Sequence, residues 1–360
     1  MKTIYLIIND ISMKGGLSRV TLNLYEELTK RYSNKYNIKI ISSVISDKAF
    51  NCNNDIVNLG LVSPHSLSKL NKLSWYIKFI YTINIFLKKE NPDVVIGAGV
   101  MFNLCLSLYL TKKYKLFGAE HSFYGNNHKI IISLRKILYK RLDLIISLTK
   151  KDEKKYQQFH KAVVTIPNFT NFCDNKNFST LDNKTLLYLG RFTTIKGVDI
   201  LISIMIDFFK TNKEWTLKMY GEGPLKSEIR KRIIDNNLEK NILVYEPTSN
   251  VKEALFSSSI YLMTSRSEGF PMVLLEAKAF GLPIVSFDCE TGPAEIIKNN
   301  EDGFIVPTGD KNQFLKKLSL LVNDYKLRKH MGENAIKNVK EFCPDKIMKQ
   351  WESLLDEKDN

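Results

Sequence analysis

Two carboxylates, Glu268 and Glu276, lie eight residues apart around a predicted helix start. Pro271 suits the first turn of this helix, because an N–H at that position would have no partner within the helix. The amides of Gly269 and Phe270 then lie at a helix N-terminus, where partial positive charge gathers. Carboxylates can accept hydrogen bonds from sugar hydroxyls, and the amides can bind an anion. This pattern predicts a site for a nucleotide sugar.

Arg191 and Lys196 place two cations five residues apart, directly after the predicted strand 185–189. Gly190 allows the chain to turn after that strand, and Lys196 leads into the next predicted helix. Arginine presents a planar fork of donors and lysine a point charge, so the two can bind a pyrophosphate from two sides. The alternative is that both are surface charges that only increase solubility.

A glycine pair, Gly15-Gly16, follows the first predicted strand and precedes a helix with one apolar face. Glycines at such a position let the backbone approach a phosphate closely, and the helix start supplies amides. His121 follows the predicted strand 115–119, at the carboxyl end where open α/β sheets bind ligands. An ordinary flexible turn and a structural histidine are the alternatives, so both features are candidates for ligand contacts.

Two further glycine turns carry weaker signals. The sequence Gly221-x-Gly223-Pro224 lacks the third glycine of a dinucleotide fingerprint and contains a proline, so it is weak evidence for an NAD site. The segment 288–295 (DCETGPAE) is the last glycine turn before a helix. The alternative to a ligand contact there is that Thr291 caps the helix, with an acid in its first turn.

Short apolar runs alternate with amphipathic helices along the whole chain, a pattern that predicts parallel sheets in an α/β architecture. Between the two sets of strands lies a polar, asparagine-rich stretch that is predicted to be a linker. Near the C-terminus, Pro344 can open a last helix with one apolar face. The predicted strands are 4–8, 38–44, 94–97, 115–119, 144–147 and 163–166, then 185–189, 216–220, 242–245, 260–264, 284–287 and 304–306.

The bulk composition is that of a globular protein with two domains. The chain has 360 residues, of which 44% are apolar and 25% charged. No apolar run approaches the length of a membrane-spanning helix, and no signal peptide is recognisable at the N-terminus. The five cysteines form no C-x-x-C pair and are odd in number, so a reduced cytosolic protein is expected.

The net charge of +15 lies entirely in the first half, because residues 1–180 hold 27 Lys and Arg against 12 Asp and Glu. This asymmetry predicts an anionic partner for that half: anionic lipid head groups, a lipid pyrophosphate or nucleic acid. A compositional bias is the alternative. The stretches 67–89 and 129–141 mix aromatic and aliphatic residues with lysines. Such helices can lie in a membrane interface or pack on the sheet, and both interpretations stay open.

These motifs together resemble glycosyltransferase family 4, retaining enzymes of the GT-B fold. The segment Ser265–Ala277 is similar to the E-x7-E segment of that family, and the other motifs occur in the family's order over nearly the whole chain. Residues 280–306 resemble the branch that builds bacterial surface polysaccharides. The shared motifs are Gly15-Gly16, Glu120-His121-Ser122, Gly190-Arg191 with Lys196-Gly197, and Gly221-Glu222-Gly223-Pro224.

The resemblance implies two Rossmann-like domains that face each other across a cleft. Residues 1–168 would form the acceptor-side domain, 169–184 a linker and 185–343 the nucleotide-sugar domain. Residues 344–360 would form a helix that returns to the first domain. The implied reaction moves a hexose or N-acetylhexosamine from a nucleotide sugar, UDP-linked in our interpretation, to a glycan acceptor on a polyprenyl diphosphate. The enzyme would act in capsule, exopolysaccharide or O-antigen synthesis. It would be cytoplasmic and peripherally bound to the inner face of the cell membrane.

The family's functional positions can be assigned in this sequence. The resemblance places Gly16 at the β-phosphate, Glu276 at the ribose and Tyr245 in the uracil pocket, where Glu246 departs from the family's glycine. The catalytic group would be His121, Glu268, Arg191 and Lys196, and the donor would also contact Gly269, Phe270 and Pro271.

Transfer would occur by same-face substitution, in which the leaving diphosphate helps to take the acceptor's proton. The sequence contains no D-x-D string, so we expect metal-independent transfer without a cofactor. Three other functions stay open: a nucleotide-sugar 2-epimerase, a non-catalytic nucleotide-sugar-binding subunit, and a nucleic-acid-binding protein. The clustered glycine loops do not suit the last of these.

Overall fold

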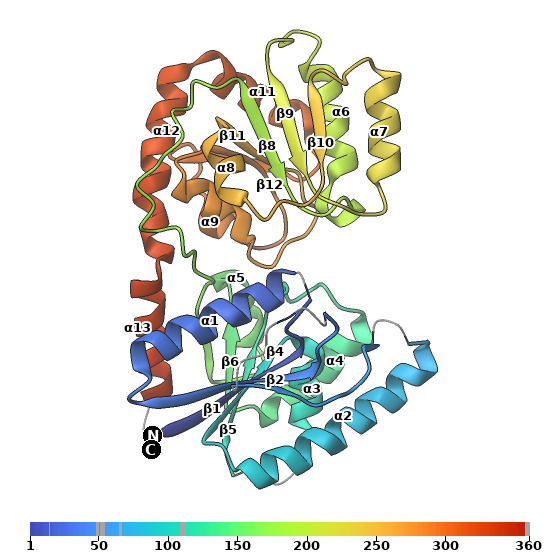
Figure 1. The fold of residues 1–360 in the computed structure, drawn as a ribbon, viewed down its shortest axis with the longest axis vertical. Coiled ribbons are helices and arrows are strands. Elements are labelled where there is room, and N and C mark those ends of the chain that lie inside the picture. The colour runs from blue at the N-terminus through green and yellow to red at the C-terminus, as the bar shows by residue number, and fades with distance from the viewer. Residues whose placement is uncertain (14, 48–49, 51–54, 65–66, 109–112, 357–360) are drawn as a thin grey trace. The chain divides into compact units, whose positions relative to one another are not determined.

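The computed structural model describes residues 1–360 except 14, 48–49, 51–54, 65–66, 109–112 and 357–360. The chain divides into two compact units. Unit 1 consists of Met1–Asn168 and Met348–Asn360, and unit 2 of Phe169–Ile347. Each unit contains one parallel β-sheet with helices packed on it (Figure 1). The α/β class predicted from the alternating pattern is confirmed.

The sheet of unit 1 has seven strands in the order β3-β2-β1-β4-β5-β6-β7, all paired in parallel. Because every connection between parallel strands must cross over, the intervening helices cover the two faces. The strands are β1 (Lys2–Asp10), β2 (Tyr36–Val44), β3 (Ile56–Asn58), β4 (Val94–Ala98), β5 (Lys115–Ala119), β6 (Leu144–Ser147) and β7 (Val163–Thr165).

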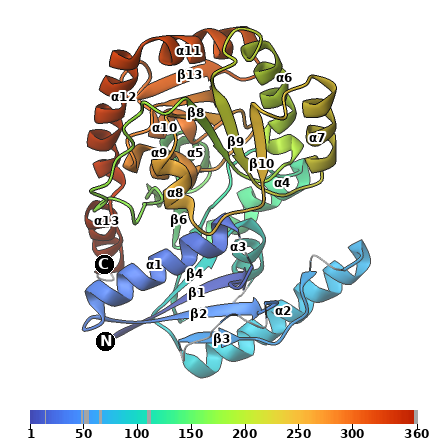
Figure 2. The same cartoon turned by 45° about the horizontal axis from the view of Figure 1, so that its top comes forward.

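One face of this sheet carries a core to which α2, α3 and the segment after α4 contribute, with Trp75, Phe79 and Tyr139 among its buried residues. Helix α1 lies on the other face (Figure 2). The helices of unit 1 are α1 (Gly16–Tyr32), α2 (Lys69–Glu90), α3 (Val100–Ser107), α4 (Lys129–Leu138), the 3-10 turn η2 (Tyr139–Arg141) and α5 (Lys150–Tyr156).

The sheet of unit 2 has six parallel strands in the order β10-β9-β8-β11-β12-β13. They are β8 (Thr185–Leu189), β9 (Thr216–Tyr220), β10 (Ile242–Tyr245), β11 (Ile260–Met263), β12 (Ile284–Asp288) and β13 (Gly303–Pro307). Helices α6, α7 and α11 share one buried core with the sheet. The helical segments are η3 (Thr194–Lys196), α6 (Val198–Phe208), α7 (Lys226–Asp235), α8 (Val251–Phe256), α9 (Met272–Ala279), α10 (Pro293–Ile296), α11 (Lys311–Asn323), α12 (Tyr325–Asn338) and η4 (Val339–Phe342). A last helix, α13 (Pro344–Asp356), begins in unit 2 and continues in unit 1.

The apolar face predicted for the last helix is confirmed, because Ile347, Trp351 and Leu355 of α13 are buried. From Met348 onward this helix belongs to unit 1, where Lys35 forms ion pairs with Glu352 and Asp356. The segment predicted as a linker, 169–184, is packed within unit 2. Its residues Phe169, Thr170 and Leu181 are buried, whereas most of its polar residues are exposed.

The expectation that all cysteines are reduced is wrong for one pair. Cys173 and Cys343 form a disulfide across 170 residues of sequence. The backbone brings them together, because the N–H of Thr170 donates to the carbonyl of Phe342 at 3.1 Å. Cys105 and Cys289 are buried free thiols, and Cys52 lies outside the described residues. In the described part of the chain, no helix is both long and apolar enough to cross a membrane.

Candidate functional site

The turn before α6 is fixed tightly against the end of β11. Gly197 has φ of +65°, and a Cβ at this position would lie 1.8 Å from the carbonyl oxygen of Thr264. The Thr264 hydroxyl donates to the Gly197 carbonyl at 2.9 Å. Only glycine combines this backbone conformation with so close an approach. The contact therefore sets the position of Lys196, the preceding residue.

Replacing Gly197 by alanine should destabilise the protein by about 3 kcal/mol or more, because a left-handed φ and a steric clash act together. The matched control is Gly309→Ala, where φ is +87° but no atom lies within 4 Å of the new Cβ. There we expect only the backbone cost of about 1 kcal/mol. Urea unfolding of both variants measures the difference, and equal losses would contradict the role given to the Thr264 contact.

Lys196 and Glu268, predicted from the sequence to act at one site, are in direct contact. The Lys196 Nζ lies 2.7 Å from both carboxylate oxygens of Glu268. The Ser265 hydroxyl also donates to Oε1 of Glu268 at 2.6 Å. An ammonium has three donors and each carboxylate oxygen accepts about two hydrogen bonds. One donor of Lys196 and one acceptor position on Oε2 of Glu268 therefore remain for a ligand.

A second ion pair, not predicted from the sequence, holds the same loops together. Arg266 binds Asp199 through two hydrogen bonds of 2.7 and 2.6 Å. These bonds lower the pKa of the Asp199 carboxyl below its ordinary value. The backbone N–H of Arg266 also donates to the Ile195 carbonyl at 2.8 Å. The pair joins the start of α6 to the loop after β11, which carries Glu268, so it supports the Lys196–Glu268 contact.

Arg191 lies in the loop between β8 and η3, on the same connection as Lys196. Its side chain is exposed, and among the described residues its guanidinium has no hydrogen-bond or ion-pair partner. Its carbonyl accepts from the Tyr188 hydroxyl at 3.2 Å, which holds the backbone of the loop. The full set of guanidinium donors is thus available to an anion.

The loop that carries Glu268 contacts the turn before α10 through a hydrogen bond and close packing. The Thr291 hydroxyl donates to the Glu268 carbonyl at 2.8 Å. Gly292 has φ of +98°, and a Cβ there would lie 2.7 Å from Cδ of Pro271. The interpretation that Thr291 caps the next helix is wrong, because α10 begins after Gly292 without a side-chain cap. Thr291 instead bonds across to the neighbouring loop, a contact that local sequence does not reveal.

Helix α9 begins one residue later than predicted, with Pro271 as its N-cap rather than in its first turn. Phe270 is buried and packs against the Phe342 ring at 5.7 Å, so only its backbone is available to a ligand. Gly269 is half-buried. Glu276 lies within α9 and is fully buried. Its role at a ribose is a prediction that these contacts do not test.

Two tyrosines stack where β9 and β10 end side by side. Tyr220 and Tyr245 are register partners, and their rings lie 4.8 Å apart and nearly parallel. Tyr245 is 40% exposed, so one edge of this pair is accessible to a base. Glu246, which departs from the family pattern, forms an ion pair with Lys226. The assignment of Tyr245 to a uracil pocket stays a prediction.

In unit 1, helix α1 begins directly after Gly15, which is its N-cap in extended conformation. The cap provides no side-chain hydrogen bond, and the first turn contains no acidic residue. A Cβ on Gly16 would meet no described atom within 4 Å. Amides at an uncapped helix start with space beside them suit an anion. This arrangement supports the assignment of Gly16 to a phosphate and does not test it.

His121 follows a carboxylate that is buried in a polar cluster. Glu120, at 2% exposure, accepts hydrogen bonds from Asn103 at 2.8 Å and Tyr139 at 2.6 Å. It also forms an ion pair of 3.0 Å with Arg135, which is fully buried. The sequence motif marked Glu120 and His121 but not these three partners, because they come from α3, α4 and η2.

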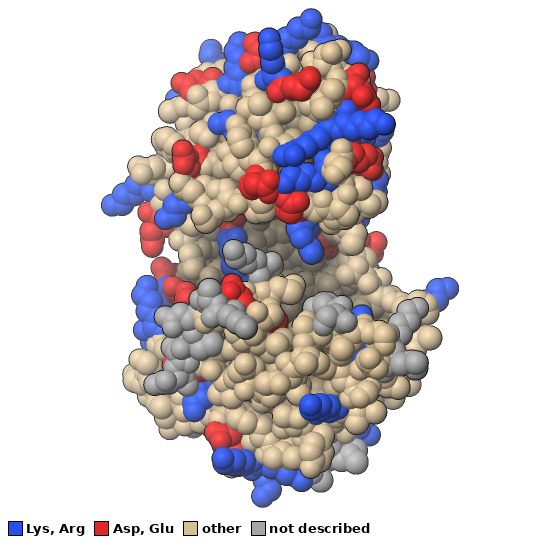
Figure 3. All heavy atoms as spheres, turned by 45° about the vertical axis from the view of Figure 1, so that its right-hand side comes forward, with Lys and Arg blue, Asp and Glu red and all other residues tan. Residues whose placement is uncertain are grey.

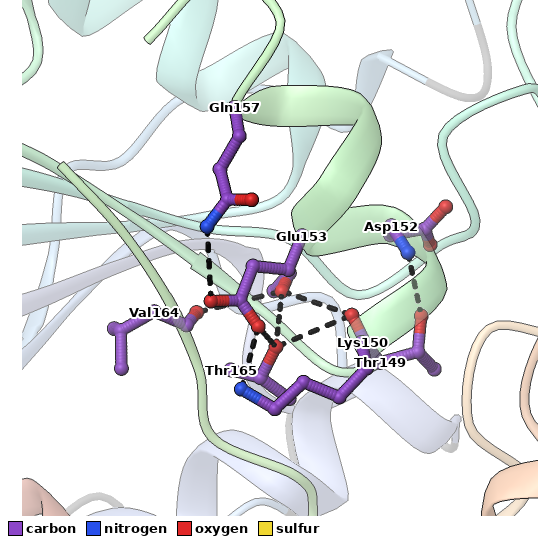
Figure 4. Close-up of polar contacts among 8 residues, drawn as sticks. Thr149, Lys150, Asp152, Glu153, Gln157, Val164 and Thr165 are labelled. Carbon is purple, nitrogen blue, oxygen red and sulfur yellow. Dashed lines mark hydrogen bonds and ion pairs between the residues drawn. The ribbon is translucent and has the colours of Figure 1, made fainter. Parts of the chain in front are cut away.

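The segment after His121 is held by both backbone polar groups of one residue, Tyr124. The backbone N–H of Tyr124 donates to Asp152 at 3.1 Å, and its carbonyl accepts from Arg135 at 2.9 Å. Asp152 is the third residue of α5, whose N-cap Thr149 accepts from the Asp152 N–H. Figure 4 shows how Glu153 of this helix bonds to Thr165 at the end of β7. The loop that carries His121 is therefore fixed to α4 and α5.

Burial lowers the pKa of His121 to about 4, so the imidazole is neutral at pH 7. Its Nδ1 is buried and has no hydrogen-bond partner among the described residues. Because the unfolded chain takes up this proton near pH 6.5 and the folded chain does not, stability falls as the pH falls from 6.5 to 4. We expect a loss of about 2 kcal/mol at pH 5 relative to pH 7.5. Urea unfolding of wild type and His121→Gln measures this, and an identical pH dependence in the two proteins would contradict it.

No group of three or more His, Cys, Asp or Glu side chains that could hold a metal ion occurs within the described ranges. The predicted site residues themselves offer cations, amides and carboxylates. In unit 2 the structure brings together Lys196, Glu268 and the loop of Arg191. In unit 1 it places Gly16 at the start of α1 and His121 after β5.

Comparison with known proteins identifies the family. The model "Glycosyltransferase Family 4" matches residues 14–172, and "Glycosyl transferases group 1" matches residues 170–338. The chain is 28% identical to the amylovoran biosynthesis glycosyltransferase AmsD of Erwinia amylovora, over 99% of this chain and 100% of AmsD. It is 26% identical to a Campylobacter jejuni enzyme over 96% of each chain. That enzyme is the GalNAc-alpha-(1->4)-GalNAc-alpha-(1->3)-diNAcBac-PP-undecaprenol alpha-1,4-N-acetyl-D-galactosaminyltransferase.

The fold is also that of known glycosyltransferases. A solved structure of S. aureus TarM with UDP and alpha-GlcNAc-glycerol has a TM-score of 0.81 and 17% identity, and covers 99% of this chain and 100% of that one. The galactosyltransferase WaaB gives a TM-score of 0.78 at 21% identity, with 99% of each chain covered. These likenesses confirm the GT-B fold. The two family models together extend from residue 14 to residue 338, and the chain belongs to the family 4, group 1 glycosyltransferases.

Proposed function

We propose that this glycosyltransferase moves a hexose or N-acetylhexosamine from a UDP-sugar to a glycan acceptor with retention of the anomeric configuration. The observation that supports this proposal most is the Lys196–Glu268 contact at the carboxyl end of a parallel sheet. The connection that carries Lys196 also carries Arg191, whose guanidinium has no partner in the described part of the chain. Such sheet ends are where α/β proteins bind ligands. The two cations would receive the charge that develops on the departing diphosphate.

The donor would be held by groups of several kinds. Arg191 and the remaining donor of Lys196 would bind the diphosphate, and the backbone at Gly269–Pro271 would contact the sugar. The open acceptor position on Glu268 would take a sugar hydroxyl. Glu276 would bind the ribose and Tyr245 the uracil. From unit 1, Gly16 would contribute an amide to the β-phosphate and His121 a neutral imidazole to the sugar.

Retention by a covalent intermediate requires a carboxylate that is free to attack the sugar. Glu268 is bound by Lys196 on both oxygens and by Ser265, which makes it a poor nucleophile. We therefore propose same-face substitution, in which the leaving diphosphate helps to take the acceptor's proton. In this proposal the side-chain cations perform the charge stabilisation, and the transfer is independent of added metal.

The acceptor is proposed to be a glycan on a polyprenyl diphosphate. The Campylobacter jejuni relative carries a PP-undecaprenol acceptor in its name, and AmsD is a biosynthesis enzyme of amylovoran. A role in capsule, exopolysaccharide or O-antigen synthesis follows from this proposal. The enzyme would then work in the cytoplasm, bound peripherally to the inner face of the cell membrane. No cofactor or nucleic acid is part of this reaction.

The decisive assay incubates the purified protein with a panel of UDP-sugars and a lipid-linked glycan, in the presence of chelator or manganese. We expect one donor to give a new glycoside with the donor's anomeric configuration by NMR, at the same rate in both buffers. An inverted product would contradict retention, and activity that requires manganese would contradict metal independence. Donor isomerisation without transfer would indicate a 2-epimerase, and donor binding without any turnover would indicate a non-catalytic subunit.

A further inference from the structure

Helix α2 of unit 1 is apolar on two opposite sides. Its inner side buries Trp75, Phe79, Ile83 and Leu87 in the core of the unit. Four large apolar residues with the same spacing of four lie on its outer side, in contact with solvent. They are Leu73, Ile77, Tyr81 and Ile85, with exposures of 64%, 62%, 68% and 52%. Packing against the sheet explains only the inner side.

Helix α4 buries an arginine and leaves several large apolar side chains in contact with solvent. Arg135 is fully buried and pairs with Glu120. The outer side of the helix carries Ile130, Leu134 and Ile137, which are 64%, 40% and 65% exposed. A soluble surface helix turns its apolar stripe to the core and its charges to water. We call the exposed apolar residues on the outer sides of α2 and α4 the apolar–lysine face: Leu73, Ile77, Tyr81 and Ile85 with Ile130, Leu134 and Ile137.

Both parts of this face belong to one helical layer. Trp75 of α2 lies in the same buried core as Tyr139, and Ile131 and Leu138 of α4 pack against that core. Helix α3 contacts both α2 and α4. Figure 2 shows α2 on the side of the sheet opposite to α1. Because the inner sides of α2 and α4 share one core, their exposed stripes both point away from it.

The charged residues of helices α2 and α4 are basic with one exception. Glu90, at the last position of α2, is the only acidic residue in the two helices, and it accepts from the Tyr5 hydroxyl at 3.0 Å. Figure 3 shows a face of unit 1 on which uncharged side chains predominate, with scattered basic and a few acidic ones. The exposed basic residues of these helices and of the turn after α4 are Lys78, Lys88, Lys89, Lys129, Lys136, Lys140 and Arg141.

The exposed apolar residues and the basic residues together favour one kind of partner for this face. A second copy of the chain would bring an equally positive surface, and like charges oppose that pairing. Aliphatic and aromatic side chains that insert between lipids, with lysines at the level of anionic head groups, are what an interfacial helix requires. The charge and the apolar stripe therefore both fit an anionic bilayer.

We infer that the apolar–lysine face of unit 1 docks on an anionic phospholipid membrane. The inference rests on the proposed function, because it identifies the surface that would bring the enzyme to a lipid-linked acceptor. His121 and Ile130 lie nine residues apart in the connection from β5 and the first turn of α4. Tyr124, three residues after His121, accepts a hydrogen bond from Arg135 of α4, so a lipid held on α4 would lie near the loop that carries the proposed catalytic histidine.

Flotation with phosphatidylcholine vesicles, with and without phosphatidylglycerol, tests this inference on the full chain. We expect binding to the anionic vesicles in low salt and at least about tenfold weaker binding in 1 M salt. The variant L73S/I77S/Y81S/I85S should bind at least about tenfold more weakly, because four inserted side chains are lost. In the variant K78Q/K88Q/K89Q, vesicle binding should be weaker in low salt and should depend much less on the salt concentration than in wild type. The control I234S/L320S removes two exposed apolar residues of unit 2 and should bind like wild type.

Three results would overturn the inference. These are no binding of wild type to anionic vesicles in low salt, equal binding by the serine variant, or wild-type dimers that the serine variant converts to monomers. Urea unfolding checks that the variants are folded, and UDP titration checks that the donor site is intact. If a protein does not bind vesicles but binds UDP with unchanged affinity, the result bears on the membrane-docking surface and not on the proposed transferase function. Absent UDP affinity in wild type would instead count against the proposed transferase.

Discussion

Lys196→Met is expected to lower kcat/KM for sugar transfer by about 10³-fold, because one preorganised cation is lost at the departing diphosphate. Methionine keeps the length of the side chain and removes the charge. Glu268 then loses the hydrogen bonds of Lys196 to both its oxygens, so its carboxylate is held less firmly toward the sugar. Steady-state rates with the donor found in the UDP-sugar panel measure the effect.

The matched control for this prediction is Lys210→Met in the same unit. Lys210 follows α6 and forms an exposed ion pair of 2.7 Å with Asp207. Exposed pairs of this kind contribute little to stability, and we expect wild-type rates. If kcat/KM of Lys196→Met falls by less than about fivefold, Lys196 does not stabilise the departing diphosphate as proposed.

Arg135→Met should destabilise the protein by about 3–5 kcal/mol, because it leaves the Glu120 carboxylate buried without its counter-ion. The guanidinium also lies over the Tyr124 and Tyr156 rings at 4.8 and 5.0 Å from their centroids. These contacts are lost in the same substitution. Urea unfolding at pH 7.5, where His121 is neutral in both states, measures the change in the free energy of unfolding.

The double variant E120Q/R135M separates the charge from the packing. Glutamine carries no charge and can still accept from Asn103 and Tyr139, so part of the stability should return. A double variant as unstable as the sum of the two single variants would show that charge pairing is not the cause. Arg135→Met that is as stable as wild type would contradict the importance of the buried pair.

Most of the fold could be predicted because parallel sheets bury both faces of their strands. All twelve predicted strands are present with bounds that differ by at most two residues at either end, since each is a short apolar run between turns. The strand β3 (Ile56–Asn58) was not predicted, because three residues at a sheet edge carry no such run. The local spacing of apolar residues was also sufficient to predict which face of α13 is buried.

The contacts of the site could be predicted only where one loop carries both partners or a family motif names them. The Lys196–Glu268 contact joins residues 72 positions apart, and only the resemblance placed them at one site. Arg266–Asp199 and Arg135–Glu120 were not predicted, since no short-range pattern marks them. The amphipathic pattern of α4 would place its arginine in water, whereas the buried Glu120 holds it in the core.

The most direct test of the proposed function is titration of the 360-residue protein with UDP in the presence of chelator. We predict saturable binding at one site, weakened at least about tenfold in Arg191→Ala, where charge-assisted hydrogen bonds to the diphosphate are lost. Glu276→Gln should also weaken binding, through the ribose. No binding of UDP, or binding that Arg191→Ala and Glu276→Gln leave unchanged, would contradict a nucleotide-sugar site in unit 2.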